Sequence, residues 1–163
     1  RHTRCSVVSW ARDVYKRQAE YDAFLTKQNP AFTVEELEEA MQKVMDQYAG
    51  GIGTHYQFNE KQLAMAEEKI KKLQILAKGL AAADMHELMF IYELKERLTV
   101  CLTVIAHLRA RKETRWHSFA ENLDYPEKSD AWLCYVNSKK NGDQITMIRR
   151  DLVKGGETYE HRD

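Results

Sequence analysis

A long segment over residues 84–113 constrains the fold most, because apolar residues recur in it every three or four positions. Its stripe consists of Leu94, Leu98, Cys101, Ile105 and Leu108. This spacing places the five side chains on one face of an α-helix and is typical of a helix that packs in a bundle. Leu88, Ile91 and Leu102 widen the stripe. We therefore expect both sides of this helix to contact protein.

Helix starts are marked by three pairs of residues spaced like N-terminal capping boxes. The pairs are Thr33 with Glu36, Asn59 with Gln62, and Asp84 with Glu87. In such a pair, each side chain accepts a hydrogen bond from the backbone N–H of the other residue. Glycines 50, 51 and 53 end the first helix. Together these signals predict helices over about 33–49, 59–82 and 84–113.

The pattern changes after residue 113, where an irregular loop precedes two β-strand patterns. Residues 132–138 and 144–149 alternate and are rich in strand-forming types, and Asn141-Gly142 lies between them. We therefore predict a mainly α fold: a three-helix bundle, an irregular loop, and a C-terminal β-hairpin over about 131–149.

The ends of the chain differ from its centre. Residues 1–18 hold five basic residues and one acid, and they resemble translated sequencing-adapter sequence. We expect this segment to be non-native or disordered, residues 19–32 to form an extended linker, and residues 151–163 to form a polar tail. Without residues 1–18 the net charge is −4 rather than zero. Because the chain starts with Arg1, we expect it to be a piece of a longer protein.

Several functions are disfavoured by composition and spacing. The charge balance argues against a nucleic-acid partner. The longest apolar run, residues 98–108, is about half the length of a membrane-spanning helix, so we predict no transmembrane segment. Three widely spaced cysteines indicate a reducing, cytoplasmic location.

The glycines near residue 50 follow a helix, which favours a helix-ending turn over a phosphate loop. His86 has Phe90 where a zinc-protease motif needs a second histidine, so we predict no metal site.

The densest group of charged and aromatic residues lies over residues 109–117, at the predicted end of the third helix. A basic, aromatic helix end can bind an anion or stack on a nucleic-acid base. The favoured alternative is structural, because basic residues suit a helix C-terminus and the Arg and Glu side chains can fasten the following loop.

This group is also part of a family resemblance. The motif residues are Arg111, Glu113, Arg115, Trp116, Asp124, Tyr125 and Trp132. In their order and spacing they resemble the C-terminal region of the fumarate reductase/succinate dehydrogenase flavoprotein family, closest to the adenylylsulfate reductase alpha subunit branch. The resemblance covers about residues 33–150. Fumarate reductases tend to have glycine where this sequence has Trp116, which favours the adenylylsulfate reductase branch.

The resemblance implies that residues 33–150 form a helical C-terminal domain of an FAD-dependent oxidoreductase subunit. It implies that the domain packs against an upstream FAD-binding domain and that an exposed face meets an iron–sulfur subunit. FAD is expected in the full-length protein, with its site and the substrate site upstream. We therefore predict no catalytic, cofactor-binding or metal-binding residue here and assign the seven motif residues a structural and docking role. The alternatives are a free-standing helical interaction module and an RNA or anion binder that uses the residue 109–115 cluster.

Overall fold

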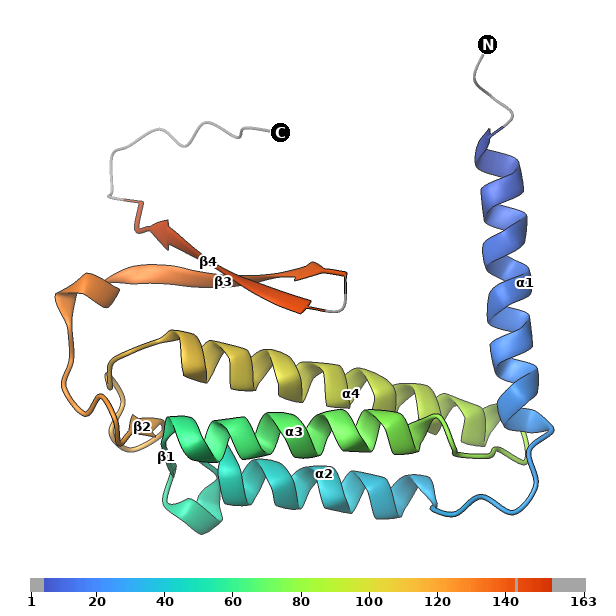
Figure 1. Cartoon of the computed structure of the whole chain (residues 1–163), viewed down its shortest axis with the longest axis horizontal. Coiled ribbons are helices and arrows are strands. Elements are labelled where there is room, and N and C mark those ends of the chain that lie inside the picture. Colours follow the sequence, from blue (N-terminus) through green and yellow to red (C-terminus); the bar gives the residue numbers. More distant parts are fainter. Residues whose placement is uncertain (1–4, 143, 154–163) are drawn as a thin grey trace. The chain divides into compact units, whose positions relative to one another are not determined.

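The protein, described here from a computed structural model, is mainly helical with two small two-stranded sheets. The structure describes residues 5–142 and 144–153, and side chains from residue 14 onward. In chain order the helices are α1 (Cys5–Leu25), α2 (Val34–Tyr48), α3 (Glu60–Ala77) and α4 (Met85–Ala110) (Figure 1). The strands are β1 (Gln57–Phe58), β2 (Glu121–Asn122), β3 (Cys134–Asn141) and β4 (Gln144–Asp151), with single 3-10 turns at Ile52–Thr54 and Asp130–Trp132. The mainly α prediction is confirmed, and α1 is an additional fourth helix.

The predicted caps form, with one shift. Thr33 and Glu36 exchange both hydrogen bonds, at 2.9 and 3.2 Å, and Asn59 and Gln62 do so at 3.0 and 2.8 Å. Before α4, the Glu87 N–H donates to Asp84 at 2.9 Å, but the Glu87 carboxylate accepts from the N–H of Ala83 instead of Asp84. Local sequence therefore sets the starts of α2, α3 and α4.

Two predicted helix ends were too late. The second predicted helix ends at Ala77, not near residue 82, because the backbone tightens into i→i+3 hydrogen bonds around Gly79. The third ends at Ala110, not near residue 113. Glu113 leaves the helical path to enter a buried ion-pair network described below. The end of α3 is thus set by a local tightening of the backbone, whereas the end of α4 is set by contacts outside the helix.

The chain divides into two compact units, to which α2, α3 and α4 each contribute. The first unit comprises Arg1–Met41 and Lys71–Leu98, and the second comprises Gln42–Ile70 and Thr99–Asp163. Residues 1–4 of the predicted N-terminal segment and 154–163 of the predicted tail lie outside the described residues. Helix α1 runs from Cys5 to Leu25. It therefore crosses residue 18, where we placed the boundary between a non-native or disordered segment and an extended linker.

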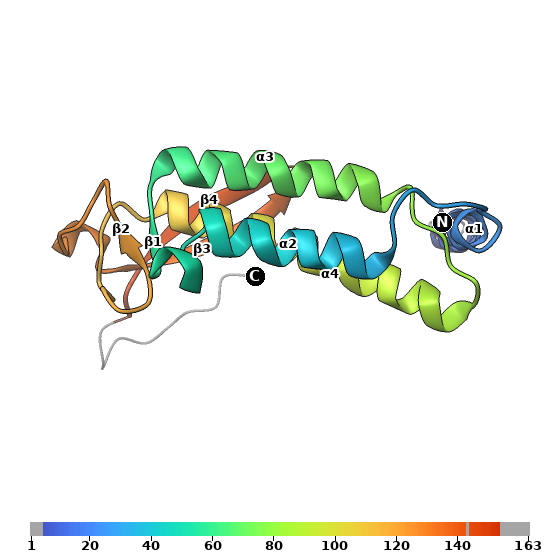
Figure 2. The same cartoon turned by 90° about the horizontal axis from the view of Figure 1, so that it is seen from below.

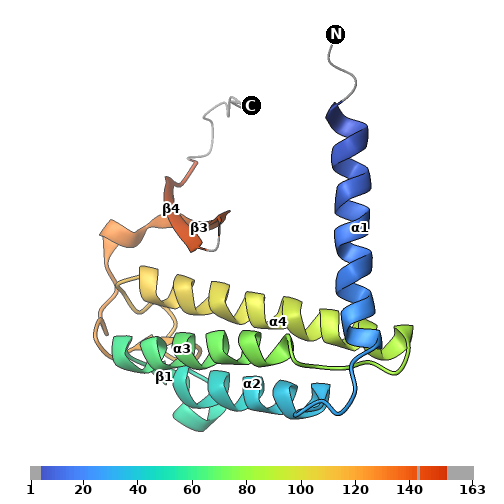
Figure 3. The ribbon, with the colours of Figure 1, turned by 45° about the vertical axis from the view of Figure 1, so that its right-hand side comes forward.

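In the first unit, the last turns of α1 lie beside the first half of α4 (Figure 3). Tyr92 meets the ring of Tyr21 edge-on at 5.4 Å, and Lys95 forms an ion pair with Glu20. The N–H of Ala82 donates to the carbonyl of Phe24 at 3.0 Å. The core of this unit consists of Phe24, Leu37, Met41, Leu73, Ala77, Leu80, Ala82, Leu88, Ile91, Leu94 and Leu98.

In the second unit, β1 and β2 pair in parallel although 64 positions separate Gln57 from Glu121 (Figure 2). The core here consists of Ala49, Phe58, Leu63, Ala66, Ile70 and Ile105. Each fully buried Leu or Ile contributes roughly 1.5–3 kcal/mol relative to exposure. The β1–β2 pair joins the start of α3 to the loop after α4, and so positions that loop.

The second sheet is antiparallel and pairs β3 with β4 over eight positions, from Cys134 with Asp151 to Asn141 with Gln144. Asn141 is therefore the last paired residue of β3, and the turn begins at Gly142, whose φ is +60°. The predicted turn was placed one residue too early. The described residues contain no helix that is long and apolar enough to cross a membrane.

Candidate functional site: an arginine–glutamate anchor after α4

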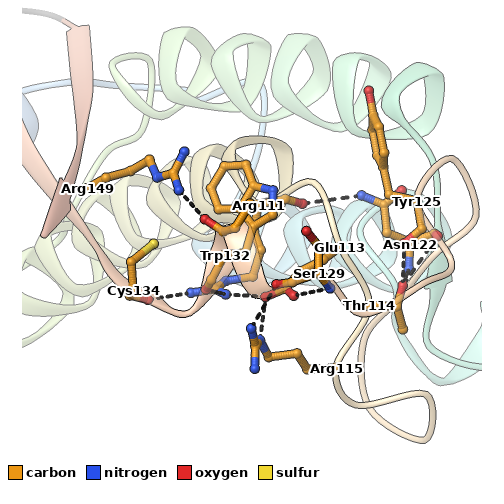
Figure 4. Close-up of polar contacts among 11 residues, drawn as sticks. Arg111, Glu113, Thr114, Arg115, Asn122, Tyr125, Ser129, Trp132, Cys134 and Arg149 are labelled. Atoms are coloured by element: carbon orange, nitrogen blue, oxygen red, sulfur yellow. Dashed lines mark hydrogen bonds and ion pairs between the residues drawn. The ribbon is translucent and has the colours of Figure 1, made fainter. Parts of the chain in front are cut away.

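A buried carboxylate lies at the centre of the loop that follows α4. The side chain of Glu113 has no exposed surface. Its Oε1 accepts from Arg111 and from Arg115, each at 2.5 Å, and its Oε2 accepts from the backbone N–H of Ser129 at 3.0 Å (Figure 4). Both carboxylate oxygens are therefore bound, as a buried charge requires.

The two arginines extend from Glu113 to the start of the β3–β4 sheet. Arg111 donates to the carbonyl oxygens of Trp132 at 2.9 Å and Cys134 at 3.1 Å. Arg115 donates to the carbonyl of Ser129 at 3.1 Å. A planar guanidinium with several fixed donors suits this task, because it can bind a carboxylate and backbone carbonyls together. We call Arg111, Glu113 and Arg115 the anchor.

The pKa of Glu113 reflects two opposing effects. Burial raises the pKa, because the charged form loses its hydration. Hydrogen bonds from Arg115, the Ser129 N–H and Arg111 favour the charged form and outweigh burial, so the pKa lies below its ordinary value. Glu113 is therefore ionised at neutral pH and forms a salt bridge with each of the two arginines.

A second set of hydrogen bonds lies beside the anchor, around a buried threonine. The hydroxyl of Thr114 donates to the Tyr125 carbonyl at 2.9 Å and accepts from the Asn122 N–H at 3.0 Å. The Thr114 N–H donates to the carbonyl of Glu127 at 3.2 Å. Asp124 accepts from the N–H of Glu60, the first residue of α3, at 2.7 Å. The loop is thus tied both to itself and to the start of α3.

The structure brings some of the seven motif residues together and separates others. Arg111, Glu113 and Arg115 form the anchor. Trp132 lies beside it: its carbonyl accepts from Arg111, and its ring lies 4.3 Å from the guanidinium of Arg149. Asp124 caps α3, and the Tyr125 ring lies 5.2 Å from the ammonium of Lys112. Trp116 takes no part in these contacts and is 69% exposed.

Sequence inspection missed four residues that complete this region: Thr114, Asn122, Ser129 and Arg149. Thr114 and Asn122 are buried polar residues in a loop, where burial cannot be inferred from periodicity. Ser129 acts through its backbone, which carries no sequence signal. The Thr114–Asn122 contact joins residues eight positions apart through one hydroxyl. The sequence signal for this network is the high density of charged residues over positions 109–117.

A cavity of about 450 Å³ adjoins the anchor. Its walls include Leu108 of α4, the anchor residues, both Trp116 and Trp132, and Val136 of β3. The volume falls in the range of small-molecule sites. The walls are mostly apolar, however, and the donors of both arginines point to Glu113 and backbone carbonyls. The cavity therefore suits apolar side chains better than an anion.

The glycine-rich turn after α2 does not fit a dinucleotide phosphate. Gly53 donates its backbone N–H to the carboxylate of Asp46 at 2.9 Å. A Cβ on Gly51 would lie 2.3 Å from the Cα of Asp46. The space and donor that a phosphate needs are thus taken by a negatively charged residue of α2, as expected for a helix-ending turn.

Comparison with known proteins gives a family match. A family model described as the fumarate reductase flavoprotein C-terminal region matches residues 38–157. Adenylylsulfate reductase subunit alpha from Megalodesulfovibrio gigas is 34% identical over 98 residues, which are 60% of this chain and 15% of that protein. The chain therefore spans a small part of this curated relative.

Solved structures share the fold. Adenylylsulfate reductase from Archaeoglobus fulgidus superposes with a TM-score of 0.79 at 33% identity, over 93% of this chain and 26% of that chain. An E. coli quinol fumarate reductase gives 0.74 at 18% identity, over 98% and 27%, a likeness that concerns the fold alone. The match over residues 38–157 identifies the chain as a member of the fumarate reductase flavoprotein C-terminal family.

Proposed function

We propose that this chain is the structural and docking domain of an FAD-dependent oxidoreductase subunit similar to adenylylsulfate reductase alpha. The complete protein would move electrons between FAD and an anionic substrate, and the residues for both would lie in parts of the protein outside this chain. The observation that carries this proposal is the anchor. Its charged donors are directed at Glu113 and backbone carbonyls of the same loop.

Two arginines near an aromatic cavity can also indicate a site for an anionic substrate. Such a site needs donors directed at the ligand, since binding comes from charge-assisted hydrogen bonds. Here Arg111 donates to the Glu113 carboxylate and to the backbone carbonyls of Trp132 and Cys134. Arg115 donates to the Glu113 carboxylate and to the backbone carbonyl of Ser129. A substrate would have to displace the buried carboxylate, which costs several kcal/mol. A structural role is therefore favoured.

Exposed apolar side chains in the second unit support docking. Trp116, Phe119 and Leu133 are all more than half exposed, although single domains rarely leave large aromatic groups in water. Trp and Tyr are enriched in interfaces because they bury much area with few rotatable bonds. We assign this surface, together with the adjoining cavity, to contact with the rest of the flavoprotein.

The arrangement of the helices and of strands β3 and β4 is part of the same proposal. We place α2, α3 and α4 in a three-helix bundle with β3 and β4 as a C-terminal hairpin. The support is that each helix buries a stripe of residues at helical spacing, such as Leu63, Ala66 and Ile70 on α3.

We further propose an iron–sulfur subunit as a partner and a cytoplasmic location. The relative from Megalodesulfovibrio gigas is an alpha subunit, which supports the existence of a second subunit. The iron–sulfur identity of that subunit is what the family resemblance implies. The location is supported by free thiols at Cys101 and Cys134.

Complementation between two chains tests the proposal. This chain is co-expressed with the Megalodesulfovibrio gigas alpha subunit from which the matching segment has been deleted. We expect the two to co-purify, with the visible flavin absorption in the complex and none in this chain alone. The Trp116→Ser variant, which changes an exposed side chain, is expected to weaken co-purification while leaving the thermal stability of this chain unchanged.

Stoichiometric flavin on the isolated chain would contradict the placement of the FAD site elsewhere. A Lys61→Ser variant, at an exposed position of α3, is the matched control and should co-purify normally. If this chain neither co-purifies nor stabilises the truncated subunit, yet unfolds cooperatively as a monomer, it is a free-standing interaction module instead.

A further inference from the structure

Helix α4 is apolar on two sides over its first half, which belongs to the first unit. One side is buried in the core of that unit and consists of Leu88, Ile91, Leu94 and Leu98. The same turns also carry Met85, Met89 and Phe90, which are 64%, 48% and 39% exposed. Apolar residues on more than one side of a helix are typical of a helix that protein covers on more than one side. The exposed side of α4 is therefore a candidate contact surface.

The exposed side of α4 combines these apolar side chains with acidic ones. One row of side chains, at spacings of four, four and three positions, consists of Met85, Met89, Glu93 and Glu96. Residues at these spacings lie on one face of a helix. Phe90 lies next to this row, and its ring is 4.8 Å from the ring of His86. The face thus has an apolar part in the first turns and an acidic part in the next ones.

A hollow of about 160 Å³ lies between this part of α4 and the first turns of α2. Its apolar lining consists of Val34, Phe90 and Leu94. Its charged lining consists of Glu35, Glu38, Glu93 and Arg97. Small-molecule sites have volumes of roughly 300–1,000 Å³, so this hollow suits one side chain of a partner better than a free ligand. We give the name acidic face to the surface of Met85, Met89, Phe90, Glu93 and Glu96 on α4 together with Glu35 on α2.

Two carboxylates of the acidic face are free to meet a partner. Within the part of the chain that the structure describes, Glu35 and Glu96 form no hydrogen bond and no ion pair. Glu93 lies 3.7 Å from Arg97, which also pairs with Glu38. The guanidinium that lines the hollow is therefore already shared by two acids and leaves Glu35 and Glu96 uncompensated.

The carboxylates are spread along the acidic face instead of meeting at one point. Glu93 and Glu96 lie one turn apart on α4, and Glu35 lies on α2. Among the described residues, no three His, Cys, Asp or Glu side chains are placed so that they could hold a metal ion. The charge therefore suits several separate cations, such as Lys and Arg side chains. Electrostatic complementarity requires a basic partner, which excludes the phosphates of a nucleic acid.

The shape of the acidic face matches a helix. Residues 85–96 span about 18 Å of α4, at about 1.5 Å per residue, and so equal about three helical turns. An amphipathic helix can lie along such a surface with its apolar side inward. Methionine side chains suit this contact because they are flexible and adapt to the shape of a partner.

The acidic face also differs in character from the surface that we assign to the rest of the flavoprotein. That surface lies in the second unit, where exposed Trp116, Phe119 and Leu133 adjoin a mostly apolar cavity. Permanent contacts are more hydrophobic than contacts between separate proteins, which have a polar and charged rim. The mixture of apolar and acidic groups on the acidic face is therefore typical of contact with a separate chain.

We propose that the acidic face binds a basic amphipathic helix of the second subunit. The apolar side of that helix rests on Met85, Met89 and Phe90, and its Lys or Arg side chains pair with Glu35 and Glu96. The inference rests on the proposed function, because it presumes that second subunit. It gives the subunit a docking chemistry and a place in the first unit, apart from the anchor and its cavity.

Fluorescence anisotropy of the full chain with a labelled peptide tests this chemistry. The peptide has about 14 residues, all Lys and Leu, with the leucines at helical spacing. Binding should saturate and should weaken as salt rises. Glu35→Lys/Glu96→Lys should weaken binding by about tenfold or more, because two ion pairs become repulsive. Met85→Gln/Met89→Gln should weaken it by a similar factor through loss of apolar contact, while glutamine preserves the helix.

The control variant Glu127→Lys/Asp151→Lys makes the same charge change at exposed positions of the second unit. It should bind the peptide nearly as well as the parent chain, and circular dichroism checks that each variant is folded. Three results would overturn the proposal: equal loss in the two charge variants, equal binding of a peptide in which Glu replaces Lys, or no saturation up to about 1 mM, a weak limit for a specific contact.

The complementation experiment tests the source of the helix. Glu35→Lys/Glu96→Lys should co-purify with the truncated Megalodesulfovibrio gigas alpha subunit as the parent chain does. The second subunit of that enzyme, added to the co-purified pair, should displace the peptide. Loss of co-purification would assign the acidic face to the rest of the same chain, and absence of displacement would exclude the second subunit.

Self-association of the parent chain, seen by sedimentation and abolished by the same variant, would assign the acidic face to a second copy. Each of these three results overturns the proposal. Peptide binding depends neither on flavin absorption nor on Trp116, which carry the test of the proposed function. Failure of this inference and failure of the proposed function can therefore be told apart.

Discussion

Replacing Glu113 by Gln is predicted to destabilise the second unit more than any other single charge removal in its loop. The change leaves Arg111 and Arg115 near a neutral amide, and the amide NH₂ group competes with their donors. Removing one partner of a buried ion pair costs about 3–5 kcal/mol. Because the side chains of Arg111 and Arg115 are 32% and 20% exposed, water screens part of this loss. We therefore expect about 3 kcal/mol, at the lower end.

Urea and thermal unfolding measure this loss. For a chain of this size, about 3 kcal/mol corresponds to a fall in Tm of roughly 6–12 °C. Amide hydrogen exchange locates the effect, because the Ser129 N–H donates to Glu113 and should lose protection in the variant. Glu127→Gln is the matched control: it makes the same chemical change at an exposed position of the same loop and should cost less than about 0.5 kcal/mol.

The pH dependence gives an independent check. Since the pKa of Glu113 is lower in the folded state than its ordinary value of 4.5, its charge stabilises the fold above that pH. The contribution is lost as pH falls from 4.5 through the folded-state pKa. The parent chain should therefore lose stability in this range, and Glu113→Gln should lose less. Equal losses for Glu113→Gln and Glu127→Gln, with parallel pH profiles, would refute the buried ion-pair argument.

Three further predictions concern the helices. Gly50→Ala should cost about 1–2 kcal/mol by urea unfolding, because φ is +77° and the added Cβ would lie 3.0 Å from Phe58. Thr33→Ala should cost about 1 kcal/mol through loss of the α2 cap, and Thr33→Ser should restore most of it. Arg109→Met removes partly exposed ion pairs to Glu60 and Glu67; it should cost about 1 kcal/mol or less, and 1 M salt should reduce the difference.

Short-range features could be predicted from sequence alone. The caps at Thr33 and Asn59 depend on residues three positions apart, and their hydrogen bonds form as the pattern indicates. The segments expected as strands lie mainly within β3 and β4, because alternation and turn residues are also local signals. The apolar stripe of α4 is largely buried, with Leu94, Leu98 and Ile105 at 1% exposure or less.

Long-range contacts explain what was missed. No sequence signal links Gln57 to Glu121, whose strands are two residues long. Helix α1 lacks a clear apolar period, and its last turns are held by contacts with Tyr92 and Lys95 of α4. Tertiary packing decides which distant segments contact each other, and the residue pattern of a single segment does not encode that choice.

The sequence by itself determined where α2, α3 and α4 begin and that Arg111, Glu113 and Arg115 belong to one charged cluster. Only the tertiary structure decided what that cluster does. It buries Glu113 and directs the arginine donors to the carbonyls of Ser129, Trp132 and Cys134. The physical reason is that capping depends on neighbours along the chain, whereas the stability of a buried charge depends on every group that replaces its water.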